Sequence, residues 1–323
     1  MQPKRAAIFA AALLALAGAA GAPAQTFPSR PIRLVVGFTP GGGVDINARL
    51  LAGKLSEVLG QTVVVENKPG AGTNIANEFV AKAPPDGYTL LINTAAVAIN
   101  MSLYKSVPFD TLKDFAPVGV FSDSQNVMVT AASKPYKTAQ DVVAAARAKP
   151  GVLTYSSAGS GSTQNLTGEL FKLKTKTDLL HVPYKGSAPS TTALMAGEVD
   201  LTFVNVPAIL SNVKAGRLRA LAVAGHKRTE LMPDVPTLKE AGIQGVEVAL
   251  WYGVLAPAGT PKEIVATLSN GIAKSARSPD LRQRLLDQGA EPVGGTPEDF
   301  AALLKEEVSR WRDVIRSAKL TAE

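Results

Sequence analysis

The sequence predicts an α/β protein with two units that are joined without a linker. Short apolar segments alternate with segments of helical periodicity from residue 32 to about residue 91, and the same order begins again at Val152. Strand–helix–strand units predict parallel strands with right-handed crossovers. No low-complexity stretch separates the two units. We therefore expect two α/β lobes joined by crossing strands.

The first unit shows this alternation most clearly. Pro31 and a glycine-rich loop bound the apolar run IRLVVGF, which is typical of a buried parallel strand. Apolar residues then recur at helical spacing from Val44 to Val58, and Gly60 follows as a C-terminal stop. The other predicted elements are the strand TVVVEN (62–67), the helix TNIANEFVAKA (73–83), the turn PPDG (84–87) and the strand YTLLIN (88–93).

The second unit repeats the order of strand, glycine-rich loop and helix in VLTYSSAGSGS and TQNLTGELFKL (152–173). Further strands are expected at LLHVPY, VDLTFVN and LRALAVAG, with helices at about 188–196 and 208–215 between them. The C-terminal third is predicted to be helical. Its helix starts are a capping box at Thr260, Ser278-Pro279 and Thr296-Pro297.

The N-terminal 24 residues have the form of a signal peptide. A short basic start precedes an apolar stretch and the sequence Ala22-Pro23-Ala24, which predicts cleavage before Gln25. The apolar part is shorter than the about 20 residues that a membrane helix needs, and an uncleaved anchor is the alternative. No cysteine is present to carry a lipid anchor. We expect the mature chain to be exported.

Composition and charge exclude several functional classes. The 323 residues are 46% hydrophobic, which indicates a globular core, and they include no cysteine for a disulfide or a thiolate metal site. The formal charge is +7, and losing Lys4 and Arg5 with the signal leaves 7 − 2 = +5. The basic residues are spread out and are not interleaved with aromatics, so nucleic acid is not an expected partner. A mild positive field favours the approach of an anionic solute.

The loop GFTPGGGVD (37–45) is the first candidate binding element. Loops at the carboxyl ends of parallel strands hold ligands in α/β sheets, and a helix N-terminus attracts anions. The loop lacks the lysine of a Walker motif. Asp45 suits the helix dipole and can pair with Arg49 at i+4. A plain turn between strand and helix is the alternative.

A second loop, Gly70 to Ile75, approaches the dinucleotide fingerprint GxGxxG/A, but its sixth position is isoleucine and no acidic residue ends a strand about 20 residues later. A nicotinamide site is therefore not expected, and no other cofactor is predicted.

A third loop, Ser156 to Thr163, is rich in hydroxyl groups that can donate to a carboxylate. A serine-dependent hydrolase is the alternative function, and its serine needs a base. The chain has only His181 and His226, and no GxSxG elbow surrounds these serines. We expect His181 to be structural, with no catalytic residues. The sequence has only these two histidines and no cluster of acidic residues to complete a ligand set, so no metal site is expected.

Three glycine-rich loops in two lobes suggest a clamp for a small solute. Loops from both lobes would face one cleft, and N–H groups and hydroxyls would neutralise an anion there. Closure of two lobes about a hinge is a known way to bury such a ligand.

At the level of whole motifs, the chain resembles the extracytoplasmic solute receptors of tripartite tricarboxylate transporters, the Bug or TctC family. The matching stretches span almost the whole mature chain. They are PGGGVDINAR (40–49), VVVENKPGAGTNIA (63–76), PPDGYTLL (84–91), YSSAGSGSTQNLTGELF (155–171), HVPYKGSAP (181–189), GEVDLTFVNVPA (197–208), AGRLRALAV (215–223) and WYGVLAPAGTP (251–261).

The resemblance implies a type II periplasmic binding protein with two α/β lobes and a ligand cleft between them. Lobe 1 would comprise residues 25–127 and 251–323, and lobe 2 residues 128–250, with a hinge near Asn126–Thr130 and Val246–Tyr252. It implies a monomeric, non-catalytic periplasmic receptor for a small organic carboxylate. The partners implied are membrane transporter subunits or a sensor kinase.

The resemblance also implies the ligand-binding residues. One carboxylate would lie between the two loops of the first lobe, and the second lobe would contribute a loop, a tyrosine and a strand end. Carried onto this chain, the residues are Phe38, Thr39, Pro40, Gly41, Gly42, Gly43, Asp45, Ala71, Gly72, Thr73, Asn74, Ser157, Gly159, Ser162, Thr163, Asn165, Tyr184 and Asn205.

Three positions depart from the family pattern. Many members have His where this chain has Asn165, Asp-Ser or Asp-Asn where it has Val204-Asn205, and Pro or Ser where it has Gly43. The distal end of the pocket therefore differs from that of a di- or tricarboxylate receptor. We expect this end to select the ligand, and the differences favour a monocarboxylate or a ligand with an apolar or aromatic tail.

Overall fold

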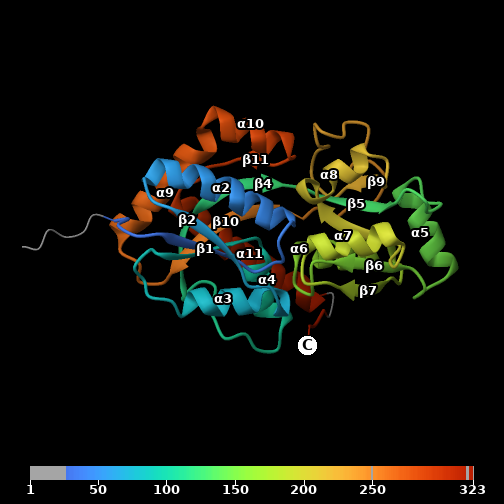
Figure 1. Cartoon of the computed structure of the whole chain (residues 1–323). Coiled ribbons are helices and arrows are strands. Elements are labelled where there is room, and N and C mark those ends of the chain that lie inside the picture. The colour runs from blue at the N-terminus through green and yellow to red at the C-terminus, as the bar shows by residue number, and fades with distance from the viewer. Residues whose placement is uncertain (1–26, 249, 318–319, 323) are drawn as a thin grey trace, which may run out of the picture.

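The computed structural model describes residues 27–248, 250–317 and 320–322. The predicted signal peptide, residues 1–24, lies outside the described residues. The described chain forms two α/β lobes, each built on one β-sheet with helices around it (Figure 1). The predicted fold class is confirmed.

The first lobe is built on a six-stranded sheet with the strand order β11-β4-β10-β3-β1-β2. Strand β1 pairs in parallel with β2 and β3, whereas β10 runs antiparallel to β3 and β4. Its elements are β1 (Ile32–Val36), α2 (Gly43–Leu59), β2 (Val63–Asn67), η1 (Ala71–Thr73), α3 (Asn74–Ala81), β3 (Thr89–Asn93), α4 (Ala96–Leu103), β4 (Phe115–Ser124), β10 (Leu250–Pro257), α9 (Lys262–Arg277), α10 (Pro279–Asp287), β11 (Glu291–Pro292) and α11 (Pro297–Ser317).

The second lobe is built on a five-stranded sheet with the order β7-β6-β8-β5-β9. Strand β6 pairs in parallel with β7 and β8, and β5 runs antiparallel to β8 and β9. Its elements are β5 (Asn126–Ala131), α5 (Ala139–Ala148), β6 (Thr154–Ser157), α6 (Thr163–Thr175), β7 (Leu180–Pro183), α7 (Ser187–Ala196), β8 (Leu201–Asn205), α8 (Val206–Lys214) and β9 (Leu218–Val223).

The chain crosses between the lobes at two adjacent places. The first crossing is at Gln125, between β4 and β5, and the second precedes β10. Leu250 pairs with Ser124, and the Ala224 amide donates to the Asn126 carbonyl at 2.8 Å, so the crossings lie side by side. The division into residues 25–127 with 251–323 and residues 128–250 stays a prediction.

Helices cover both faces of the first sheet. Leu55 of α2 and Ile272 of α9 belong to the core on one face, and Val80 of α3, Ile99 of α4 and Trp311 of α11 belong to the core on the other. This packing holds fixed the helices whose N-termini reach the cleft. Among the described residues, no helix has the length and apolarity that crossing a membrane requires.

The helix starts expected in the C-terminal third are found, with one difference. Helices α10 and α11 begin at Pro279 and Pro297. The capping box at Thr260 is wrong, because the Thr260 hydroxyl donates to the Pro257 carbonyl at 2.7 Å and α9 has no side-chain cap. The hydroxyl closes the turn before the helix instead.

Candidate functional site

The loop between β1 and α2 is shaped by Asp45. This buried carboxylate accepts hydrogen bonds from the Gly41 amide, Arg49 Nε and Asn67 Nδ2, each at 2.9 Å. Burial alone raises the Asp45 pKa, but the hydrogen bonds outweigh it and lower the pKa below its usual value. The predicted pairing with Arg49 is confirmed. Asp45 therefore holds the loop, and its charge is already compensated.

The loop between β2 and α3 has an uncommon backbone. Ala71, Gly72 and Thr73 all have positive φ, at 45°, 58° and 84°. Two of them are not glycine, and such strain persists only where surrounding structure enforces it. Asn100 supplies part of that support, because its Nδ2 donates to the Gly72 carbonyl at 2.6 Å and to Asn74 Oδ1 at 2.7 Å.

The two lobes touch across these loops. The Thr39 amide donates to the Lys185 carbonyl at 3.2 Å, and the Tyr104 hydroxyl donates to the Ser160 carbonyl at 3.1 Å. Glycine is needed where the lobes come closest. A Cβ on Gly72 would lie 2.2 Å from the Ser160 carbonyl oxygen.

Between the lobes lies a small space, which we call the inner cavity. Its volume of about 10 Å³ is close to what one water needs. The lining residues are Phe38, Gly42, Val44, Thr94, Ala158, Ser162, Thr163, Gln164, Ser187, Asn205 and Leu250. In this arrangement a carboxylate fits only if the lobes separate or the loops move.

Four helices begin at the inner cavity. Gly42 is the N-cap of α2, Ser162 that of α6 and Asn205 that of α8, and Ser187 is the first residue of α7. Only α6 has a side-chain cap, so the other three present N–H groups without one. Each N-terminus carries about half a positive charge, and four together supply about two. The cavity therefore favours an anion without an arginine or lysine in its lining.

A larger space, the outer pocket, lies beside the inner cavity and shares Ala158 with it. Its volume is about 220 Å³. It is lined by Gly37, Gly70, Ala71, Gly72, Thr73, Tyr104, Ala158, Gly159, Ser160, Pro183, Tyr184 and Lys185. The strained loop lies on one side of this pocket, and Lys185 of the second lobe lies on the other.

The structure places the predicted ligand-binding residues in different surroundings. Those that line the inner cavity or the outer pocket are Phe38, Gly42, Ala71, Gly72, Thr73, Gly159, Ser162, Thr163, Tyr184 and Asn205. Thr39 and Gly43 meet the second lobe, Asp45 and Asn74 brace the loops, and Pro40 and Gly41 are exposed. Ser157 and Asn165 line neither space.

Ser157 and Asn165 belong to a polar cluster behind the third loop. Ser157 Oγ lies 2.7 Å from His181 Nε2, and Asn165 Nδ2 donates to the Tyr155 hydroxyl at 3.0 Å. His181 stacks on the Tyr155 ring, and burial lowers its pKa to about 4. Ser157 is 0% exposed, whereas His181 is half-buried and lines a separate space of about 250 Å³, so the histidine of this contact can be reached but the serine cannot.

Several lining residues were not expected from the sequence. Thr94 follows β3, and the rule that ligands meet the carboxyl ends of parallel strands points to it. Ser187 lies in the matching stretch HVPYKGSAP and starts α7. Gln164 also lies in a matching stretch, YSSAGSGSTQNLTGELF, although it was not among the residues carried over. Tyr104 ends a helix and had no such signal.

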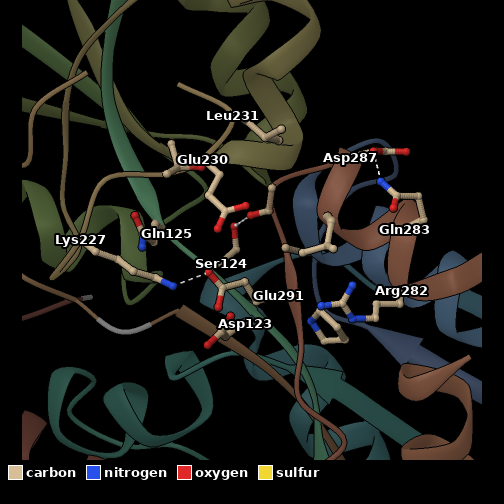
Figure 2. A pocket seen from close by; sticks show the side chains of 15 residues that line it. Asp123, Ser124, Gln125, Lys227, Glu230, Leu231, Arg282, Gln283, Asp287 and Glu291 are labelled. Atoms are coloured by element: carbon tan, nitrogen blue, oxygen red, sulfur yellow. Dashed lines mark hydrogen bonds and ion pairs between the residues drawn. The ribbon is translucent and has the colours of Figure 1, made fainter. Parts of the chain in front are cut away.

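A third space, the hinge pocket, has a volume of about 500 Å³ and lies beside the first crossing (Figure 2). Lys227 of the second lobe bonds Glu291 of the first at 2.6 Å, and Asp123 lies beside this pair. Lost hydration and the nearby Glu291 raise the Asp123 pKa to about 6. Acidic side chains and the C-terminal half of α10 oppose a carboxylate here, so the cleft is the better candidate.

Among the described residues, no cluster of histidine, aspartate or glutamate could hold a metal ion.

Comparison with known proteins agrees with this geometry. Residues 47–320 match the model of the tripartite tricarboxylate transporter family receptor. The chain is 41% identical to the UPF0065 protein in the tcbD-tcbE intergenic region of Pseudomonas sp. (strain P51), covering 92% of this chain and 89% of that one. It is 38% identical to BugT of Bordetella pertussis, covering 94% of each.

Solved structures show the same architecture. The periplasmic binding protein BugD superposes with a TM-score of 0.89 at 33% identity, covering 92% of this chain and 100% of that one. Rpa4515 of R. palustris, solved with adipate, gives 0.88 at 40% identity, covering 91% and 99%. MatC from Rhodopseudomonas palustris, with bound malate, gives 0.86 at 33% identity, covering 90% and 100%.

Proposed function

Because this chain belongs to the receptor family of tripartite tricarboxylate transporters, we propose that it binds a small organic carboxylate between its two lobes. The observation that carries the proposal is the convergence of four helix N-termini on the inner cavity. Free N–H groups from both lobes suit a carboxylate, whose two oxygens accept several hydrogen bonds at once. Adipate and malate in two similar structures support this ligand class.

Binding is coupled to movement of the lobes in this proposal. The inner cavity of about 10 Å³ is too small for a carboxylate, so the lobes open to admit it and close around it. The adjacent crossings at Gln125 and before β10 form the hinge. Loop groups from both lobes then hold one ligand, which is why closure and binding stabilise each other.

The proposed role is delivery rather than catalysis. The receptor is exported after cleavage near Ala24, acts as a monomer in the periplasm without a cofactor, and passes its ligand to a membrane transporter or a sensor kinase. The serine–histidine contact argues weakly for a hydrolase, because Ser157 is 0% exposed and burial keeps the His181 pKa near 4. A receptor returns its ligand chemically unchanged.

The experiment is a thermal-shift screen of the mature protein against short aliphatic and aromatic carboxylates, followed by calorimetry. A ligand at a hundredfold excess over its Kd stabilises the fold by about 2.7 kcal/mol. Recovery of unchanged ligand by mass spectrometry after incubation is the expected result. Turnover of the ligand, or no stabilisation by any carboxylate while esters are hydrolysed, would favour the hydrolase.

A matched variant tests the location of the site. Gly72→Asp places a side chain on a left-handed residue, 2.2 Å from the Ser160 carbonyl oxygen at its Cβ, and adds a negative charge to the cleft. Gly197→Asp makes the same change at a left-handed helix end where the Cβ meets nothing within 4 Å. The first variant should lose binding and the second should keep it.

A further inference from the structure

Two residues that line the inner cavity have buried amide oxygens without a hydrogen-bond donor. Gln164 Oε1 and Asn205 Oδ1 accept no hydrogen bond from the described residues. Both residues line the cavity, and they are 2% and 3% exposed. A buried acceptor without a donor is costly, and native proteins rarely leave one unpaired. These oxygens therefore require donors from whatever occupies the cavity.

The position of each side chain is fixed by its surroundings. Gln164 Nε2 donates to Ser187 Oγ at 2.7 Å, which turns Oε1 away from that hydroxyl. Asn205 packs against Gly43 so closely that a Cβ added to this glycine would lie 2.1 Å from Asn205 Oδ1. Neither side chain has room to turn its oxygen to solvent.

A carboxylate alone does not satisfy this cavity. It accepts hydrogen bonds from the helix N-termini, but it has no proton to give to Gln164 or Asn205. The cavity is close to the size of one water, so a hydroxyl on the ligand can take the place of that water and donate to Gln164 or Asn205. Gln164 is the second residue of α6 and Asn205 caps α8, so the acceptors lie at the same helix ends as the N–H groups. The donor accordingly lies close to the carboxylate.

The charge of the cavity decides what kind of donor fits. Among the residues that line it, none is aspartate or glutamate. The nearest acidic side chain on α2, Asp45, is already bonded to Arg49, Gly41 and Asn67. Helix N-termini repel a cation, so an ammonium group is disfavoured and a neutral hydroxyl is favoured.

Resting on the proposed function, we propose that this receptor selects carboxylates with a hydroxyl group on the carbon next to the carboxylate, and that Gln164 and Asn205 are its specificity-determining residues. The hydroxyl donates to one amide oxygen, and closure shields the pair from water. The sequence differences placed Asn205 at the distal end of the ligand, and we now place it beside the carboxylate, because Asn205 lines the cavity where the helices begin. The expectation of an apolar or aromatic tail stays a prediction.

The test compares matched triples that differ only in one substituent. The probes are propionate, lactate and alanine; succinate, malate and aspartate; and phenylacetate, mandelate and phenylglycine. Calorimetry on the mature protein should show, in at least one triple, that the hydroxy acid binds about 10- to 100-fold more tightly than both relatives, because one buried acceptor is left unpaired without it.

Variants then assign the preference to residues. Gln164→Met keeps the length of the side chain and removes its oxygen, and Asn205→Leu does the same for the other amide. Each should reduce the preference for the hydroxy acid over its unsubstituted relative at least fivefold. Gln140→Met makes the same exchange on an exposed helix position and should leave the preference unchanged.

The outcomes separate the two proposals. Equal binding of hydroxy and unsubstituted acids, tighter binding of the amino acid, or a preference that survives both variants would overturn the assignment while leaving the carboxylate receptor in place. No binding of any probe in any triple, with no stabilisation by other carboxylates, would overturn both.

Discussion

Replacing Gly43 with alanine tests whether the closed lobes are the ligand-binding form. Gly43 is the first residue of α2, and its conformation is helical, so alanine meets no backbone strain there. Across the cleft, however, the new Cβ would lie 2.1 Å from Asn205 Oδ1 and 2.5 Å from Asn205 Cγ. Ordinary contact begins at 3.4 Å, so the shortfall is 3.4 − 2.1 = 1.3 Å.

The magnitude follows from where the clash occurs. Asn205 is 3% exposed and cannot move to solvent, so the closed form must shift by about an ångström. Overpacking of this kind costs about 1–3 kcal/mol. The open form has no such contact, so the whole cost falls on closure. At 1.4 kcal/mol for each factor of ten, affinity should fall about 5- to 150-fold.

The assay is calorimetry with the tightest carboxylate from the screen. Gly53→Ala is the matched control, because it makes the same change in the same helix at an exposed site where the Cβ meets nothing within 4 Å. The control should raise the free energy of unfolding by up to about 1 kcal/mol and leave affinity unchanged. In an Asn205→Ala background, Gly43→Ala should have little further effect. Equal affinities for the Gly43 and Gly53 variants would refute the reasoning.

Three further predictions concern closure, pH and the hinge. Gly72→Ala should weaken binding at least tenfold by calorimetry, because its Cβ would lie 2.2 Å from the Ser160 backbone oxygen, which cannot turn away; wild-type affinity would contradict this. Burial lowers the His181 pKa from 6.5 to about 4, so the unfolded chain takes up the proton at a higher pH than the folded chain does. The free energy of unfolding should therefore fall by about 3 kcal/mol as the pH drops from above 6.5 to 4. Denaturant titrations of His181→Gln should show a flatter acid limb, and an unchanged slope would count against it. Lys227→Met should weaken ligand binding less than about fivefold, because the ion pair between Lys227 and Glu291 is exposed. High salt screens this pair, so the wild type and the variant should then bind equally. A loss of affinity that does not depend on salt would contradict this explanation.

The sequence predicted the elements well where periodicity and turns agree. The strand IRLVVGF, the helix that ends before Gly60 and the three glycine-rich loops are found as β1, α2 and the cleft loops. Strand direction was harder. The alternation of strands and helices predicted parallel sheets, but β4, β5 and β10, which were not predicted from periodicity, run antiparallel to their neighbours.

The parts of the candidate site that could be predicted are those whose backbone requires glycine. Gly43 and Gly72 lie at the cleft, where close approach between the lobes leaves no room for a side chain. Gln164 lies in a matching stretch but was not predicted, since a glutamine in the first turn of a helix has no pattern of its own that marks a cavity. Asn165 shows the reverse case, in which a polar residue beside the third loop bonds Tyr155 and lines neither the inner cavity nor the outer pocket.

The most direct test of the account is a crystal structure of the mature protein with the tightest carboxylate that the screen identifies. The account predicts one carboxylate enclosed between the lobes, with its oxygens at the N–H groups of α2 and of at least one of the second-lobe helices α6, α7 and α8. A carboxylate seated in the hinge pocket, or held on one lobe with the cleft open to solvent, would contradict it.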